Sequence, residues 1–407
     1  MKATDWRKAY GDLLGRLPDY VGNARLTLGG LSTFLDGYVR LHEAEPLLCT
    51  AEGTPQAALS KELFRRAGAG IGGEFHLDWP EGGPWVEQHL KVARWGLGGT
   101  GAQAAHTLAL LGAPALISLQ DRSERQRSVI HPDVQVATPR GVVRCGELRA
   151  VPGSKPAHYV FEFTAGIKAG SIVPARSSRI IVRFGNERLD DDPDFYRESI
   201  AAASRAGAGI LSGFNEIAEQ DLEEALEWTI SLARSWKDRG LSLIHLEVGD
   251  YAVARARDLV LNKLGGVITS LGMNYAELRG LCNGGQDPLD RACQLSEAFD
   301  LARLCVHADE WALALTRSDP QRELEALLCG CLVASSRAEK GYPCRPSGLP
   351  AQAQFHGVPC DAFVKSDGRS LVCCAAPYLE KPAATIGLGD TFLAGTLLVL
   401  GGKRTTL

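Results

Sequence analysis

The sequence lacks a run of about 18 apolar residues, the length that a membrane-spanning helix requires. It also lacks a basic stripe, since the formal net charge is -4 and the isoelectric point is about 6.2. Residues 1–17 mix charged and apolar side chains at helical spacing and have no apolar core of the kind that signal peptides carry. These absences predict a protein with neither membrane nor nucleic acid among its partners.

Cysteine patterning is equally sparse. The chain has 11 cysteines, an odd number without regular spacing, and no CxxC pair. A disulfide framework calls for an even, regularly spaced set, and a cysteine zinc site calls for such pairs. We therefore expect buried, reduced thiols and a cytoplasmic location.

What the sequence does contain is an alternation of strand and helix. The pattern predicts strands at 115–119, 158–163, 180–184, 243–248, 266–271 and 304–307, and helices at 52–67, 101–111, 219–237, 323–340 and from 391 onward. Alternating strands and helices favour an α/β fold with a doubly wound, mostly parallel sheet. In such sheets ligands bind beyond the carboxyl ends of the strands.

Polar residues occur at these strand ends, where a binding site is expected. They are Glu247, Asn274 with Glu277, His307 and Asp390. Each single Glu could equally be a solvated surface residue, and His307 could be a core histidine satisfied by backbone.

The segment Gly387-Leu388-Gly389-Asp390 precedes an apolar helix, residues 392–400. The free N–H groups of such a turn form an anion site that the helix dipole strengthens, with the carboxylate beside it. Asp390 could instead be an ordinary helix N-cap. The stretch 385–395 as a whole resembles the signature of the ribokinase-like superfamily. That resemblance implies an anion hole at Gly387, Leu388 and Gly389, and Asp390 as the base that deprotonates a sugar hydroxyl.

Further segments resemble the ADP-dependent glucokinase and phosphofructokinase family in their order along the chain. They are residues 156–163, 174–179, 211–215, 242–247, 270–278 and 304–316. The resemblance implies that Arg176 or Arg179 contacts phosphate, and that Asn274 and His307 bind nucleotide or phosphate. Glu247 and Glu277 would hold Mg²⁺ or another divalent cation, because hard cations prefer carboxylate oxygen. The sequence departs from the family at Tyr275, Ala308 and Ser177–Ser178.

The sugar side is predicted in the first hundred residues. The resemblance places a sugar-binding Asp at Asp36, and Glu74 where glucose-using members carry a discriminating Glu. Gly96–Gly101 satisfies GxGxxG and opens a helix, with Asp121 twenty residues later, so a dinucleotide-binding site is an alternative. In the kinase interpretation Gly98, Gly99 and Gln103 face the sugar.

Together these observations predict a ribokinase-like fold with a smaller β-rich lid. The large nucleotide-binding domain would comprise residues 1–19, 91–144 and 186–407, and the sugar-binding lid residues 20–90 and 145–185. The expected function is phosphoryl transfer from ADP to glucose or a related hexose or sugar phosphate, by a monomer or small homo-oligomer. Alternatives are an ATP-dependent ribokinase-like kinase, a catalytically inactive sugar-binding protein and, more distantly, a dinucleotide oxidoreductase.

Overall fold

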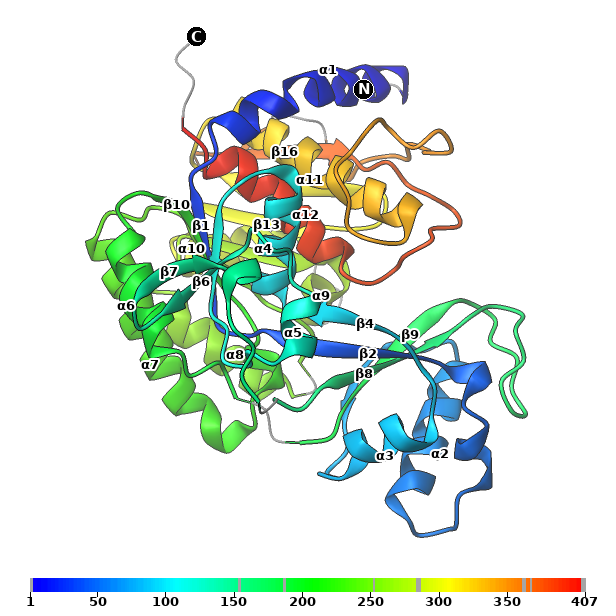
Figure 1. Cartoon of the computed structure of the whole chain (residues 1–407). Helices are drawn as coiled ribbons and strands as arrows, with labels where there is room; N and C mark the ends of the chain where they lie inside the picture. Colours follow the sequence, from blue (N-terminus) through cyan, green and yellow to red (C-terminus); the bar gives the residue numbers. More distant parts are fainter. Residues whose placement is uncertain are drawn as a thin grey trace.

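The computed structural model describes residues 3–152, 155–185, 188–251, 253–282, 287–360, 364–366 and 368–403. In this part of the chain two sheets form, one large and one small (Figure 1). The larger has 11 strands in the order β15 (Val364–Ser366), β16 (Arg369–Ala375), β14 (Trp311–Thr316), β13 (Arg303–His307), β12 (Ser270–Asn274), β11 (Ile244–Glu247), β10 (Ala206–Leu211), β1 (Leu26–Gly29), β5 (Ala115–Ile117), β6 (Gln135–Thr138) and β7 (Gly141–Arg144). The seven strands from β13 to β6 pair in parallel, and antiparallel strands extend the sheet at both edges.

Helices cover both faces of this sheet, because its strands carry apolar side chains on both sides. Cys305 of β13 packs on one side, and its neighbours Leu304 and Val306 pack on the other. The first side is covered by α1 (Ala3–Gly22), α4 (Thr100–Leu111), α11 (Pro320–Lys340) and α12 (Leu388–Leu400). The second side is covered by α6 (Pro193–Ala202), α7 (Glu219–Asp238), α8 (Ala254–Leu264), α9 (Tyr275–Gly280) and α10 (Pro288–Ala298). The predicted doubly wound fold is therefore confirmed.

Several of these helices begin at a capping side chain followed by proline. Asp192, Asp287 and Asp319 each accept a hydrogen bond from a backbone N–H of the first helical turn, and each precedes a proline. The caps satisfy N–H groups that the helix leaves unpaired, and proline there loses no hydrogen bond. Local sequence therefore determines where α6, α10 and α11 start.

The smaller sheet has five strands in the order β3 (Gly73–His76), β9 (Ser178–Arg183), β8 (His158–Phe163), β2 (Phe34–Arg40) and β4 (Val92–Gly98). Helices α2 (Pro55–Gly68) and α3 (Gly82–His89) pack on it around a separate apolar core. A short helix, α5 (Glu124–Ser128), lies beside β2. In Figure 1 this unit projects from the large sheet, and α1 lies at the opposite end of the molecule.

The two sheets divide the chain at different points from the predicted segments. Strand β1 lies in the large sheet, and β4 lies in the small one. Residues 92–98 lack the apolar pattern of a buried strand, because β4 is an edge strand and half of its side chains lie near solvent. The assignment of the two units to nucleotide and sugar stays a prediction.

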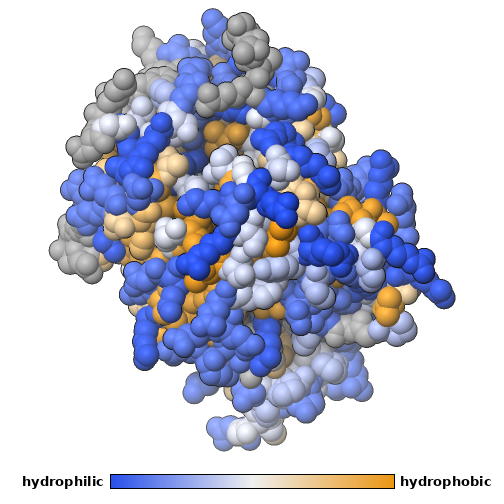
Figure 2. Space-filling model, turned by 90° about the vertical axis from the view of Figure 1, so that its left-hand side faces the viewer, coloured by the Kyte–Doolittle hydropathy of each residue, from blue (hydrophilic) through white to orange (hydrophobic). Residues whose placement is uncertain are grey.

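No helix among the described residues is both long and apolar enough to cross a membrane. On the face shown in Figure 2, hydrophilic side chains predominate, with apolar areas between them.

Candidate active site

The Gly387 turn stands at the start of α12. Gly387 has a φ of 68°, in the left-handed region that favours glycine, and no side chain caps the helix. Asp390 therefore lies within the first turn and is not the N-cap, so the capping alternative is wrong. The helix leaves its first N–H groups, those of Leu388, Gly389 and Asp390, without intrahelical partners. Such groups and the helix dipole together favour an anion.

The Asp390 carboxylate interacts with side chains from four elements: α11, α4, β11 and β13. Burial raises its pKa above the ordinary value, while the charge of Arg337 and a hydrogen bond from Thr100 oppose that shift. Glu247 acts in the same direction as burial, and His307 acts against it. A carboxylate with a raised pKa is a better proton acceptor than an ordinary Asp. This arrangement suits a general base.

Glu247 ends β11 and is held by two histidines. Its Oε2 lies 2.9 Å from Nε2 of His245, and its Oε1 lies 3.6 Å from Nε2 of His307. Burial acts to raise the pKa of Glu247, but these two histidines outweigh it and lower the pKa to about 2. Glu247 is therefore a stable anion at neutral pH. A Cβ on Gly272, in the neighbouring strand, would collide with both Glu247 and His245, so glycine leaves the space that the pair occupies.

A buried polar chain continues from His245 toward α11. His245 Nδ1 lies 2.8 Å from Ser270 Oγ, and Arg303 donates to that oxygen at 3.4 Å. Arg303 also pairs with Glu323 of α11 at 2.8 Å. Between this chain and α12 lies a cavity of about 10 Å³, roughly the space of one water molecule. These buried hydrogen bonds fix the orientation of His245 and, through it, that of Glu247.

Asn274 and Glu277 form a capping box at the start of α9. Asn274 Oδ1 accepts from the Glu277 N–H at 2.9 Å, and the Glu277 Oε2 accepts from the Asn274 N–H at 2.8 Å. Burial first, and the charge of Glu247 second, raise the pKa of Glu277 to about 7. The cap explains the Asn-x-x-Glu spacing structurally, and the phosphate role of Asn274 stays a prediction.

His307 ends β13 next to the Gly387–Asp390 turn. A Cβ on Gly389 would lie 3.1 Å from its ring. Burial acts to lower the pKa of His307, yet the Glu247 carboxylate reverses that effect and the pKa is raised. An imidazole that carries a proton here adds positive charge beside the turn amides.

The two arginines predicted to contact phosphate have different surroundings in the structure. Arg179 of β9 is half-buried; burial lowers its pKa, while Glu74, Tyr38 and Asp390 oppose the shift. Arg179 thus brings a charge of the small sheet to Asp390. Arg176 is exposed, and its aliphatic stem packs against Gly70. Of the two, Arg179 is the one whose charge interacts with Asp390.

The predicted sugar residues lie on the small sheet and at its junction with α4. Asp36 is 5% exposed, lies 3.7 Å from the Nδ1 of His158, and contacts the backbone position of Gly98 so closely that a Cβ would not fit. Gln103 is buried in the first turn of α4, which Gly99 precedes with a φ of 88°. Glu74 lies 3.9 Å from the guanidinium of Arg183.

The dinucleotide alternative fails on topology. The GxGxxG stretch begins in β4, which pairs antiparallel with β2 at the edge of the small sheet. A dinucleotide fingerprint requires a strand of a parallel βαβ unit. Asp121, the expected ribose ligand, instead accepts hydrogen bonds from the backbone N–H groups of Ser123 and Lys155.

The sequence interpretation missed three residues that face the site: Arg337, Thr100 and His245. Thr100 and His245 adjoin predicted motifs and could have been found from them. Arg337 carries no such signal, because Ser335, Ser336, Glu339 and Lys340 surround it at the polar end of α11.

Two carboxylates whose charges interact favour a cation nearby. In the described residues no three Asp, Glu, His or Cys side chains form a ready-made metal cage. Glu247 and Glu277 nevertheless interact strongly enough to shift a pKa, and both offer hard oxygen atoms. One or two carboxylates, completed by water and phosphate oxygens, are typical of Mg²⁺. These residues fit that ion.

A doubly wound sheet, a small β-rich unit at its carboxyl edge, and a Gly-x-Gly-Asp turn opening a helix define the ribokinase-like class. Within that class, the family model described as "ADP-specific Phosphofructokinase/Glucokinase conserved region" matches residues 57–399. The chain therefore belongs to this family, the ADP-dependent sugar kinases.

Relatives agree with this assignment. An ADP-dependent glucose/glucosamine kinase of Pyrococcus furiosus is 22% identical over 352 residues, which cover 75% of this chain and 77% of the relative. A solved "ADP-dependent kinase complex with fructose-6-phosphate and ADPbetaS" has a TM-score of 0.80 at 18% identity, covering 98% of this chain and 99% of that one. A last common ancestor of ADP-dependent phosphofructokinases from Methanosarcinales has a TM-score of 0.77 at 17% identity, covering 100% of both chains. At these identities the structures support the fold.

Proposed function

We propose that the protein transfers the terminal phosphoryl group of ADP to a hydroxyl of an unphosphorylated hexose, with Asp390 as the general base. The observation that supports this proposal most directly is the position of Asp390. It lies in the first turn of α12, whose free amides suit an anion, and its pKa is raised. An acceptor hydroxyl between the turn and Asp390 would have a base and an anion site within reach.

The reaction breaks one bond and forms another. The hydroxyl oxygen attacks the β-phosphorus of ADP, a new O–P bond forms, and AMP leaves. Asp390 accepts the hydroxyl proton as the oxygen attacks. The N–H groups of the Gly387–Asp390 turn face the charge on the transferring group, and His307 and Arg179 add positive charge. Positioning and charge stabilisation provide most of the catalysis in phosphoryl transfer.

Glu247 and Glu277 would hold Mg²⁺, which neutralises phosphate charge when it is bound. Glu247 is already an anion, because His245 and His307 stabilise its carboxylate. The buried contact with Ser270, whose hydroxyl oxygen also accepts from Arg303, holds His245 in one orientation. The protein thus presents an oriented carboxylate toward the expected position of the ion.

One charge of the small sheet, the Glu74 carboxylate, favours a sugar without phosphate. The Glu74 carboxylate would repel a phosphorylated acceptor, and it can accept hydroxyl hydrogens from a neutral sugar. Of the basic residues that a sugar phosphate could use, Lys155 is committed to Asp190 at 2.8 Å, and Lys168 and Arg176 are exposed.

A donor and acceptor screen tests the proposal. Glucose, glucosamine and fructose 6-phosphate are each incubated with ADP or ATP and MgCl₂, and sugar phosphate and AMP are measured. We expect product with ADP and an unphosphorylated hexose, and none after chelation of Mg²⁺. Transfer from ATP alone would support the ATP-dependent alternative. Sugar binding without transfer from either donor would support the inactive sugar-binding alternative.

The variant Glu74→Gln tests the acceptor assignment. It should weaken the binding of glucose and strengthen the binding of fructose 6-phosphate; the reverse would contradict the acceptor assignment.

A further inference from the structure

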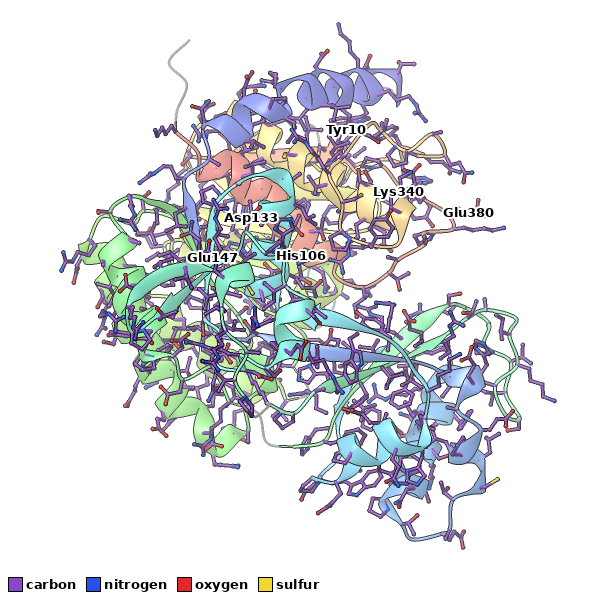
Figure 3. The ribbon with its side chains drawn as sticks, viewed as in Figure 1. Tyr10, His106, Asp133, Glu147, Lys340 and Glu380 are labelled. Carbon is purple, nitrogen blue, oxygen red and sulfur yellow. The ribbon has the colours of Figure 1, made fainter. Side chains whose placement is uncertain are left out.

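Two arginines of α11 contact the two ends of α12. Arg322, near the start of α11, reaches the carboxyl end of α12, and Arg337, near its end, reaches the amino end. In Figure 3, Lys340 marks the end of α11 that lies beside the start of α12. The same residue type therefore meets opposite ends of one helix dipole.

At the carboxyl end a cation stabilises the helix. Arg322 Nη2 donates to the carbonyl oxygen atoms of Val399 and Gly402, both at 2.7 Å. These carbonyls carry the partial negative charge of the helix end, so an arginine here is an ordinary stabilising contact.

At the amino end a cation opposes the dipole. Arg337 is 6% exposed, and the helix end beside it carries partial positive charge. Its Nε is buried without a hydrogen-bond partner among the described residues. For comparison, the buried Arg303 pairs with Glu323 at 2.8 Å, whereas no described carboxylate forms such an ion pair with Arg337. The arrangement costs stability, so packing alone does not account for it.

The groups around Arg337 show where its charge acts. Asp390 of α12, with Tyr38 and Asp36 of β2, attracts it, and Arg94 of β4 repels it. The cation therefore lies between the turn and strands β2 and β4 of the small sheet, where an incoming phosphoryl group would supply negative charge.

Arg337 also holds one peptide group of the turn. Its Nη1 donates to the Gly387 carbonyl oxygen at 2.9 Å and to Thr391 Oγ1 at 3.0 Å. The same carbonyl accepts from the Thr391 hydroxyl at 2.8 Å and from the Thr391 N–H at 3.1 Å. Because a trans peptide is planar, fixing this carbonyl fixes the Leu388 N–H in the opposite direction, toward the anion side of the turn. A cation on the carbonyl also polarises the peptide and strengthens that N–H as a donor.

We propose that Arg337 is a positioning residue for phosphoryl transfer: it orients and polarises the Gly387–Leu388 peptide so that the Leu388 N–H meets the transferring phosphoryl group. This inference rests on the proposed function, which supplies the phosphoryl group. A Cβ on Gly387 would collide with the guanidinium, so glycine at this position also lets Arg337 approach.

The test compares Arg337→Gln and Arg337→Lys with the control Arg322→Gln. We expect Arg337→Gln to lower kcat by about 100-fold, as loss of one oriented donor does. The KM for the sugar should stay within about three-fold of wild type, because the effect belongs to the transferring group. Arg337→Lys, which keeps the charge, should recover part of kcat. Arg322→Gln should lower the melting temperature and leave kcat within two-fold.

A second measurement does not depend on turnover. Inorganic phosphate, at constant ionic strength, should raise the melting temperature of the wild type and of Arg322→Gln more than that of Arg337→Gln. If the wild type transfers no phosphoryl group, the proposed function fails while this comparison still tests Arg337. Should Arg337→Gln not fold, Arg337→Met takes its place. The inference is overturned if the uncharged variant keeps wild-type kcat, or if phosphate stabilises it as much as it stabilises the control.

Discussion

At the scale of single residues, Asp390 carries the strongest prediction. Asp390→Asn keeps the shape of the side chain and removes the base, so turnover should fall by about 10²- to 10⁴-fold. Binding of sugar and ADP, measured by titration calorimetry, should persist. Asp133→Asn, at a surface carboxylate 58% exposed, is the control. Turnover of Asp390→Asn near the wild-type level would exclude the base assignment.

The pKa of Asp390 gives the same assignment a pH dependence. A base must be ionised, so kcat/KM falls as pH drops through its pKa. Because burial raises that pKa, the acid limb should lie above the value of an ordinary Asp, about 3.9. An acid limb at or below that value would contradict the described environment.

Gly272 is the second residue with a specific consequence. A Cβ there meets the Glu247 carboxylate and the His245 ring, so Gly272→Ala should displace Glu247. The Mg²⁺ concentration for half-maximal turnover should rise at least several-fold, and stabilisation by Mg²⁺ in thermal melts should weaken. Gly266→Ala is the matched control, since a Cβ there has nothing within 4 Å. Equal Mg²⁺ responses in both variants would remove Glu247 from the metal site.

At the scale of elements, the connections between the sheets meet at one buried ion pair. Lys155 Nζ, on the way into β8, lies 2.8 Å from Asp190, which follows β9, and 3.6 Å from the Phe34 ring of β2. The Asp190 N–H also donates to the Leu31 carbonyl, before β2, at 2.6 Å. One lysine thus joins three crossing segments.

Lys155→Gln should therefore destabilise the whole fold. It leaves the buried Asp190 without its cation, which costs about 3 kcal/mol in the free energy of unfolding. Lys168→Gln, at an exposed position of the same unit, should change that energy by less than about 0.5 kcal/mol. Urea denaturation of both variants measures the difference, and similar values would show that the junction does not depend on this pair.

The sequence predicts those elements whose signals are local. The helices 219–237 and 323–340 appear within three residues of α7 and α11, because the apolar periodicity that predicts them lies within each segment. The turn at Gly387–Asp390 is local in the same way. Residues 92–98, which the sequence assigns to the large domain, form β4 of the small sheet, because that position depends on pairing with β2, far away in the chain. Arg337 was missed because the carbonyl that it holds lies 50 residues further on.

At the scale of the whole molecule, the proposed site is divided between two units. Asp390, Glu247 and His307 belong to the large sheet and its helices, whereas Asp36, Glu74 and Arg179 belong to the small sheet. The charges of Arg179 and Asp390 attract each other across the two units. Phosphoryl transfer needs both units close together, because water would otherwise compete for the phosphoryl group.

Arg179 should therefore couple nucleotide binding to the approach of the small sheet. A bound phosphate at the turn gives this arginine a second anion beside Asp390, so nucleotide and sugar together should compact the molecule. Small-angle scattering of the wild type should show a smaller radius of gyration with both ligands than with sugar alone. In Arg179→Gln this difference should largely vanish, and the KM for ADP should rise by about ten-fold. Arg176→Gln, three residues earlier and exposed, should behave as the wild type. If both variants compact normally, the charge of Arg179 does not bring the two units together, and closure depends on the sugar contacts of Asp36 and Glu74.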